Sequence, residues 1–126
     1  MEIYFDGGCS PNPGQMSSCI VVCEEGKKAQ AFTMKNLGYG TNNIAEWSGL
    51  IWAVQWAKDN GLKKCIIYGD SKLAIMQASG AWKINNELLA DLFKQFQQVS
   101  QGIDLDLRHV PRNSNKAGIY LEHGTL

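Results

Sequence analysis

The distribution of apolar positions along the chain predicts an opening series of three strands. Apolar and polar residues alternate over residues 1–6, which is the two-residue period of a strand. Residues 17–25 are apolar and rich in β-branched side chains, and after a turn at Gly26 residues 29–37 return as a third strand. Together these segments predict an antiparallel meander at the start of the fold.

The rest of the chain alternates helical and strand-like patterns. A 3.6-residue apolar period from Asn43 to about Asn60 predicts a helix that Gly61 ends. Short apolar or alternating runs predict strands at 63–70 and 103–110, and helices are predicted at 71–79, 85–102 and 113–123. The order β-β-β-α-β-α-α-β-α predicts an α/β fold with one mixed sheet and helices packed on it.

Composition narrows the class of protein. A chain of 126 residues with 44% hydrophobic and 19% charged residues predicts one globular domain over residues 1–126. The net charge is zero, so any binding of nucleic acid depends on local patches. The four cysteines form no CxxC pair, which predicts reduced structural thiols. Without an export signal or a membrane-length apolar run, we expect a soluble, cytoplasmic monomer that contacts no membrane.

Three carboxylates occupy matching places in this pattern. Asp6 is predicted to close the first strand, Glu46 to lie in the first turn of the long helix, and Asp70 to close the fourth strand. Strand ends and helix starts converge on one crevice in open sheets, so the three meet if the first and fourth strands are neighbours. Clustered carboxylates repel one another unless they are protonated or neutralised by cations, and oxygen ligands suit Mg²⁺ or Mn²⁺.

Each carboxylate also has a purely structural interpretation. Glu46 follows Asn43 by three residues, which is the spacing of a capping box. Asp70 precedes a helix and fits an N-cap, and Asp6 fits the start of a glycine turn. Taken singly, none of the three therefore requires a metal site.

Four segments resemble the motifs of a known family. "FDGGCSPNPG" at 5–14, "TNNIAEWSGL" at 41–50 and "YGDSKLAI" at 68–75 resemble three motifs of type 1 ribonuclease H. "HVPRNSNKAG" at 109–118 resembles the last motif of its short bacterial, archaeal and phage-like members. The resemblance implies a ribonuclease H-like fold, with a five-stranded mixed sheet in the order 3-2-1-4-5 flanked by helices.

The resemblance also implies a reaction. Members of the family hydrolyse the RNA strand of RNA–DNA hybrids with two Mg²⁺ ions, for which Mn²⁺ is a substitute, and leave 5′-phosphate and 3′-hydroxyl ends. Asp6, Glu46 and Asp70 match the metal-holding carboxylates, and the backbone of Gly7 is expected to join them.

The same resemblance predicts a set of substrate contacts. Thr41 is expected to contact a DNA-strand phosphate, and Gly7 and Gly8 are expected to let the backbone approach the RNA where a Cβ would clash. Asn85 is an alternative to Asn86 in the phosphate pocket. The complete predicted substrate-binding set is Gly8, Asn12, Thr41, Asn42, Asn43, Ser71, Asn86 and Arg112.

The chain departs from the family pattern at one catalytic position. Gly118 stands where the family carries a fourth carboxylate. Glu122 lies one helical turn later and is predicted to stand in for it, directly or through water; the alternative is a solvated terminal glutamate. The departure leaves open a second function, a catalytically weak or inactive nucleic-acid-binding module. A third is a nuclease of the same fold acting on double-stranded RNA or DNA junctions, because the "TNN" segment at 41–43 favours the hybrid without deciding the substrate.

Overall fold

The computed structural model describes residues 1–126, and its antiparallel half follows the predicted meander. Strand β1 (Glu2–Cys9) pairs with β2 (Gly14–Cys23), and β2 pairs with β3 (Gln30–Met34). A two-residue strand, β4 (Tyr39–Gly40), also pairs with β2 at the start of that strand. The sequence pattern did not predict β4, because two residues are too few to show a period.

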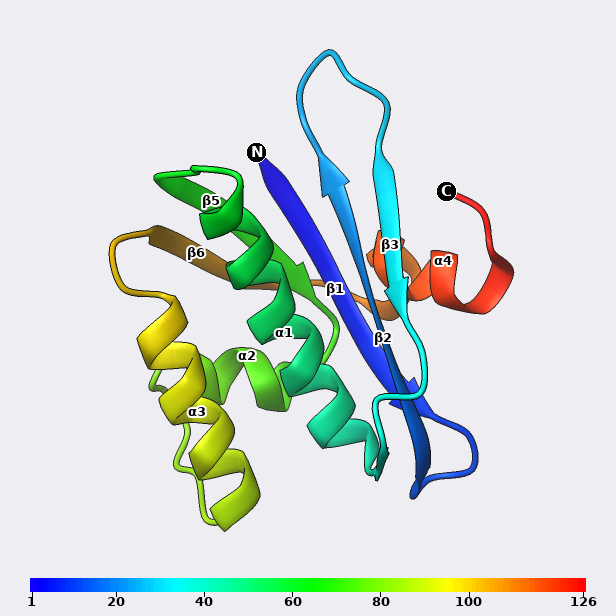
Figure 1. The fold of residues 1–126 in the computed structure, drawn as a ribbon, viewed down its shortest axis with the longest axis vertical. Helices are drawn as coiled ribbons and strands as arrows, with labels where there is room; N and C mark the ends of the chain where they lie inside the picture. The colour runs from blue at the N-terminus through cyan, green and yellow to red at the C-terminus, as the bar shows by residue number, and fades with distance from the viewer.

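The parallel half of the sheet lies on the other side of β1. Strand β5 (Lys64–Gly69) pairs in parallel with β1, and β6 (Asp104–His109) pairs in parallel with β5. The sheet order β3-β2-β1-β5-β6 confirms the predicted order 3-2-1-4-5, with β4 as an addition (Figure 1). The first and fourth predicted strands are therefore neighbours, as convergence of the carboxylates requires.

Helices cover both faces of the sheet. Three helices pack on one face: α1 (Asn42–Asp59), α2 (Lys72–Ala78) and α3 (Glu87–Val99). A 3₁₀ turn, η1 (Arg112–Ser114), leads to α4 (Lys116–His123), which lies behind β1–β3 on the opposite face (Figure 1). None of these helices combines the length and the apolar character that crossing a membrane requires.

Alternation along β1 directs its side chains to two different layers. Ile3 and Phe5 are fully buried in the core beneath α1, where Trp47 makes edge-to-face contacts with aromatic rings of α3. Tyr4 packs on the other face against the small cluster that contains Ala117 of α4. Asp6 continues this second series, so its carboxylate points toward α4 rather than into the main core.

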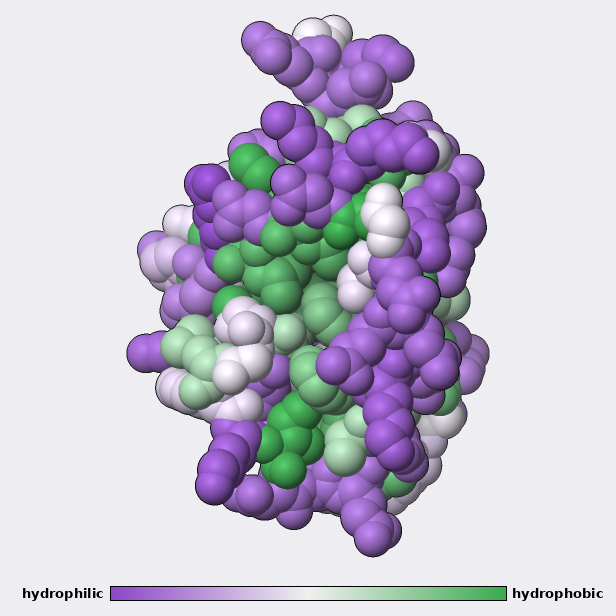
Figure 2. Space-filling model, turned by 90° about the vertical axis from the view of Figure 1, so that its left-hand side faces the viewer, coloured by the Kyte–Doolittle hydropathy of each residue, from purple (hydrophilic) through white to green (hydrophobic).

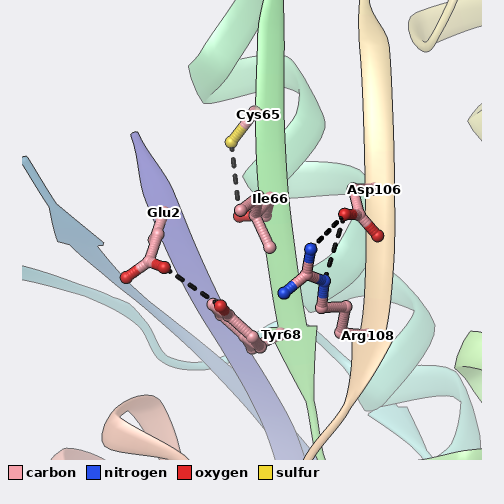
Figure 3. A network of polar contacts seen from close by, with 6 residues as sticks. All are labelled: Glu2, Cys65, Ile66, Tyr68, Asp106 and Arg108. Atoms are coloured by element: carbon pink, nitrogen blue, oxygen red, sulfur yellow. Dashed lines mark hydrogen bonds and ion pairs between the residues drawn. The ribbon is translucent and has the colours of Figure 1, made fainter.

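The parallel half of the sheet remains open on the face that α4 leaves uncovered. Figure 3 shows polar pairs there: the Tyr68 hydroxyl donates to Glu2 at 3.0 Å, and Arg108 pairs with Asp106 on β6. These polar pairs let much of this face meet solvent without a covering helix. Figure 2 shows the side of the molecule formed by β6 and α3, where apolar surface gathers between polar rims.

Strand β1 is longer than predicted. It continues through the glycines to Cys9, because its antiparallel pairing with β2 persists as far as Cys9 and Met16. The prediction that Asp6 closes the strand was therefore wrong: Asp6 lies within it, paired with Cys19. A strand interior holds the carboxylate more rigidly than a turn would.

The helix caps also differ from the structural alternatives considered for the carboxylates. Thr41 caps α1 by accepting the Ile44 N–H at 3.4 Å, so Glu46 lies beyond the first turn and forms no capping box with Asn43. Ser71 caps α2 by accepting the Ala74 N–H at 3.2 Å, so Asp70 is not the N-cap. Neither carboxylate is engaged in capping.

Candidate active site

Three carboxylates from three elements meet at one point. Asp6 comes from β1, Glu46 from α1, and Asp70 from the residue directly after β5. One carboxylate oxygen from each lies within 4.8 Å of the others. The structure therefore brings together the three acidic residues that are far apart in the sequence, as the motifs predicted.

Glu46 is the most buried of the three carboxylates. Only 7% of its surface is exposed, and its Oε2 atom is buried without a hydrogen-bond partner. Burial and then the charge of Asp6 raise the pKa of Glu46 far above its usual value of 4.5. An orphaned buried carboxylate oxygen is costly unless a proton or a cation binds it, so the site has room and need for a cation.

Asp6 is subject to the same forces. Burial raises the pKa of Asp6, and hydrogen bonding with the Glu46 side chain lowers it. The negative charge of Asp70 raises this pKa further, while the Gly7 amide and the positive charge of Arg112 lower it. Burial and repulsion thus oppose ionisation of Asp6 and Glu46 together. Bound Mg²⁺ or Mn²⁺ would reverse this preference, because a divalent cation favours the charged carboxylates.

We expect the metal-free protein to lose stability as the pH rises above about 5. The pKa of Glu46 is raised in the folded state, so above 4.5 the folded chain holds a proton that the unfolded chain releases. The free energy of unfolding then falls with pH, with a slope of at most about 1.4 kcal/mol per pH unit from this group.

Chemical denaturation of the parent and of Glu46→Gln, each in EDTA between pH 5 and pH 9, measures this contribution. The Gln variant should show a flatter pH dependence, because it cannot lose the proton. Parallel curves for the two proteins would contradict the raised pKa.

Gly118 lies directly against the carboxylates. A Cβ at this position would stand 3.2 Å from Asp6 Oδ2 and 3.5 Å from Asp70 Oδ2, so a side chain here would enter the cluster. Glu122 lines the same hollow but lies outside the group of three, with an exposed carboxylate 3.9 Å from His123. The substitution by Glu122 stays a prediction.

Gly7 packs tightly against the start of α1. A Cβ on Gly7 would stand 2.1 Å from the Ala45 carbonyl oxygen and 2.8 Å from the Glu46 nitrogen, both backbone atoms of α1. The fold itself therefore requires glycine at position 7, whether or not RNA approaches, and the predicted close approach of RNA at Gly7 stays a prediction. Gly8 faces only Asn42 Oδ1, at 3.5 Å, and its predicted contact with substrate stays a prediction.

An open hollow of about 1290 Å³ lies in front of the carboxylates. The predicted site residues that line it are Asp6, Gly7, Gly8, Asn42, Glu46, Arg112 and Glu122. Asp70 is not part of this lining. Arg112 gives the hollow a cationic wall, and the backbone of Gly7 and Gly8 gives it a polar one, near the anionic cluster. This combination suits a phosphate and its cations.

The other predicted substrate residues lie around this hollow or at helix starts. Asn12 Oδ1 accepts the Asn42 N–H at 3.2 Å, and Asn42 Oδ1 accepts the Cys9 N–H at 3.0 Å, so these side chains also join the turn after β1 to α1. Asn43 is exposed in the first turn of α1. Thr41, Ser71 and Asn86 are the N-caps of α1, α2 and α3.

One residue in contact with the cluster, Asn115, was not predicted from the sequence. Asn115 is fully buried at the start of α4, and its side-chain nitrogen donates to Asp70 Oδ2 at 3.2 Å. It lies within the quoted segment at 109–118, but an Asn before a helix has the ordinary signature of an N-cap. Only contact with a residue 45 positions away distinguishes it.

A family model described as reverse transcriptase-like matches residues 4–121. The chain belongs to this reverse transcriptase-like family. The predicted resemblance to type 1 ribonuclease H is confirmed, because the chain is similar to a curated Ribonuclease HI and to a crystal structure of an RNase H1.

The chain is similar in sequence and in structure to ribonuclease H from Halobacterium salinarum. The chain is 33% identical to its Ribonuclease HI over 127 residues, which cover 100% of this chain and 64% of that protein. The crystal structure of RNase H1 from Halobacterium salinarum NRC-1 superposes with a TM-score of 0.86 at 30% identity, covering 96% of each chain. The chain thus spans less than two thirds of the length of this curated family relative.

A second relative was crystallised with its nucleic-acid ligand. LC11-RNase H1 in complex with RNA/DNA hybrid has a TM-score of 0.82 and 27% identity, over 91% of this chain and 88% of that one. The ribonuclease H-like fold predicted from the sequence is therefore confirmed for this member of the reverse transcriptase-like family.

Proposed function

We propose that this protein is a metal-dependent ribonuclease H that hydrolyses the RNA strand of RNA–DNA hybrids. The observation that carries the proposal is the meeting of Asp6, Glu46 and Asp70 within 4.8 Å around an unpartnered buried carboxylate oxygen. A pure binding module gains nothing from concentrated negative charge beside phosphates. The hybrid as substrate is supported by the relative crystallised with RNA/DNA hybrid.

The donor set fits Mg²⁺, with Mn²⁺ as a substitute. All three side chains offer oxygen, which hard divalent cations prefer, and the backbone of Gly7 lies beside them in the hollow. When bound, two such ions supply an activated water and neutralise the charge on the phosphoryl group and the leaving oxygen. Asp6, Glu46 and Asp70 would together hold these ions, and the expected products carry 5′-phosphate and 3′-hydroxyl ends.

The chain's own residues would position the hybrid. Figure 1 shows the starts of α1 and α3 at the same end of the molecule, where Thr41 and Asn86 cap the two helices. Helix N-termini favour phosphates, so these two residues would hold the DNA strand. Asn42 and Asn43 would then contact the hybrid near its minor groove.

The RNA strand would lie nearer the carboxylates. Gly8 and Arg112 line the hollow, and Ser71 follows Asp70 directly. Asn12 would act through Asn42, whose backbone N–H it accepts. Recognition of the 2′-hydroxyls on one strand and of DNA-like phosphates on the other would make the site specific for the hybrid.

One assay tests the proposal against its alternatives. The protein is incubated with labelled RNA–DNA hybrid, double-stranded RNA, a DNA junction, DNA duplex and single strands, in Mg²⁺, Mn²⁺ or EDTA. We expect metal-dependent cutting confined to the RNA strand of the hybrid, and none by Asp70→Asn. Cutting of double-stranded RNA or junctions instead would assign a different substrate to the same fold.

A second candidate function is a catalytically weak or inactive module that binds hybrid or structured nucleic acid. Gly118 favours it, because the family position for a fourth carboxylate carries no side chain although it faces Asp6 and Asp70. Binding of the hybrid without cutting, in every metal tested, would support this function and reject the nuclease.

Glu122 provides a test of how the missing carboxylate is replaced. If Glu122 reaches the ions directly or through water, Glu122→Gln should lower the cleavage rate or raise the metal concentration needed for half-maximal rate. A metal titration of cleavage by parent and variant measures both. Identical titration curves would show that Glu122 is a solvated terminal residue, in keeping with its exposure.

A further inference from the structure

The backbone pairing between β1 and β5 ends before it reaches Asp6 of β1 and Asp70, which follows β5. Strands β1 and β5 pair in register from Glu2 and Ile66 to Tyr4 and Tyr68, and no further. Asp70 lies beyond the end of β5, so no ladder hydrogen bond sets its distance from Asp6. Something other than sheet pairing must hold the two carboxylates at their close separation.

The Asn115 side chain fills this gap. Its nitrogen donates to the Phe5 carbonyl oxygen, directly before Asp6, at 2.9 Å, and to Asp70 Oδ2 at 3.2 Å. An amide nitrogen carries two protons, so both bonds form at once. Its oxygen accepts the Ala117 N–H at 3.1 Å, which caps α4.

Burial makes this arrangement rigid. Asn115 is 0% exposed, so water cannot replace a lost partner without reorganising the site. The single amide therefore joins the backbone of β1, the carboxylate after β5 and the first turn of α4. The two donated bonds are specific to the asparagine side chain, since an aspartate would lack the two donors and a serine would be too short to span them.

We propose that Asn115 is a positioning residue, which orients the Asp70 carboxylate and holds it at a fixed distance from Asp6 for metal binding. This inference rests on the proposed function, in which Asp70 is a metal ligand. By occupying one lone pair of Oδ2, the amide leaves the remaining lone pairs of Asp70 for the ion. Partners of this kind are worth about 10- to 100-fold in metal affinity when they are removed.

Mn²⁺ binding to the substrate-free protein tests the proposal, measured by titration calorimetry. Asn115→Ser keeps a side-chain oxygen that can cap α4, but removes both donated hydrogen bonds. We expect its Mn²⁺ dissociation constant to rise about tenfold. In cleavage assays kcat should fall, while KM for the hybrid stays at the parent value, because Asn115 touches no substrate.

Gln77→Ala is the matched control. Gln77 is another buried amide, 4% exposed, which accepts from Trp47 Nε1 and donates to the Lys83 carbonyl oxygen, in the core beneath α2. We expect it to lower the melting temperature without changing Mn²⁺ affinity. An unchanged Mn²⁺ affinity in Asn115→Ser, or an equal loss in Gln77→Ala, would overturn the positioning role.

A measurement on the parent protein covers the case in which Asn115→Ser does not fold. In ¹⁵N NMR spectra the two side-chain amide protons of Asn115 should be protected from exchange with solvent and should shift on addition of Mg²⁺. Rapid exchange, or resonances indifferent to Mg²⁺, would overturn the proposal. Neither the Mn²⁺ titration nor the NMR measurement requires cleavage. Failure of the ribonuclease assignment is therefore distinguishable from failure of this inference.

Discussion

The change Asp6→Asn is expected to reduce cleavage of the hybrid by about 1000-fold or more while it stabilises the metal-free fold. Asp6 offers a carboxylate oxygen within 4.8 Å of those of Glu46 and Asp70, so an amide there removes one of the three negative charges available to hold cations. Metal ions supply several kcal/mol of transition-state stabilisation, and about 4 kcal/mol corresponds to three powers of ten in rate.

The gain in stability has the same electrostatic origin. Burial and the charge of Asp70 raise the pKa of Asp6, which means that the folded state disfavours its ionised form. A neutral amide removes this cost and can donate to the neighbouring carboxylates. The melting temperature in EDTA should rise, by about 3–6 °C for each kcal/mol of repulsion removed.

Asp104→Asn is the control for this experiment. Asp104 is exposed at the start of β6, at the opposite end of the sheet from the carboxylates, and the same change there should alter neither activity nor melting temperature. Added Mg²⁺ should stabilise the parent more than Asp6→Asn, because the variant binds it more weakly. Full activity in the variant, or a lower melting temperature, would contradict the role of Asp6.

Gly7→Ala is expected to destabilise the fold by about 3 kcal/mol, near the upper end for overpacked sites. The added methyl group would stand 2.1 Å from the Ala45 carbonyl oxygen. The next nearest atoms, the Ala45 carbonyl carbon and the Glu46 nitrogen, also belong to the α1 backbone. A backbone carbonyl cannot rotate away as a flexible side chain can. The helix must move from β1, which separates Glu46 from Asp6, so cleavage should fall together with stability.

Gly8→Ala provides the comparison within the same strand. Its Cβ would meet only Asn42 Oδ1, at an ordinary contact distance of 3.5 Å, so thermal denaturation should show a small effect. For Gly7→Ala the melting temperature should fall by about 10 °C or more. Equal melting temperatures for the two variants would show that α1 accommodates the methyl group.

The order of elements and the identity of the three carboxylates followed from local patterns. Alternation and helical periodicity are properties of neighbouring residues, so they predicted the order of elements along the chain and the positions of α1, α2 and α3 well. The order of strands in the sheet came from the resemblance of the motifs to ribonuclease H, not from periodicity. The motif residues Asp6, Glu46 and Asp70 could be named because each motif is itself contiguous. Caps were less predictable, since several adjacent polar residues compete for one position, as Thr41 and Asn43 do at α1.

Other features depend on contacts between distant parts of the chain. Asp6 lies inside β1 because that strand pairs with β2. Glycine is needed at position 7 because α1 approaches it closely, and Gly118 faces the carboxylates because of the way α4 packs. Asn115 reaches Phe5 across 110 positions of sequence. Periodicity records how a residue relates to its neighbours, whereas these distances are set by packing after the sheet and its two helical layers have assembled, and no local pattern encodes them.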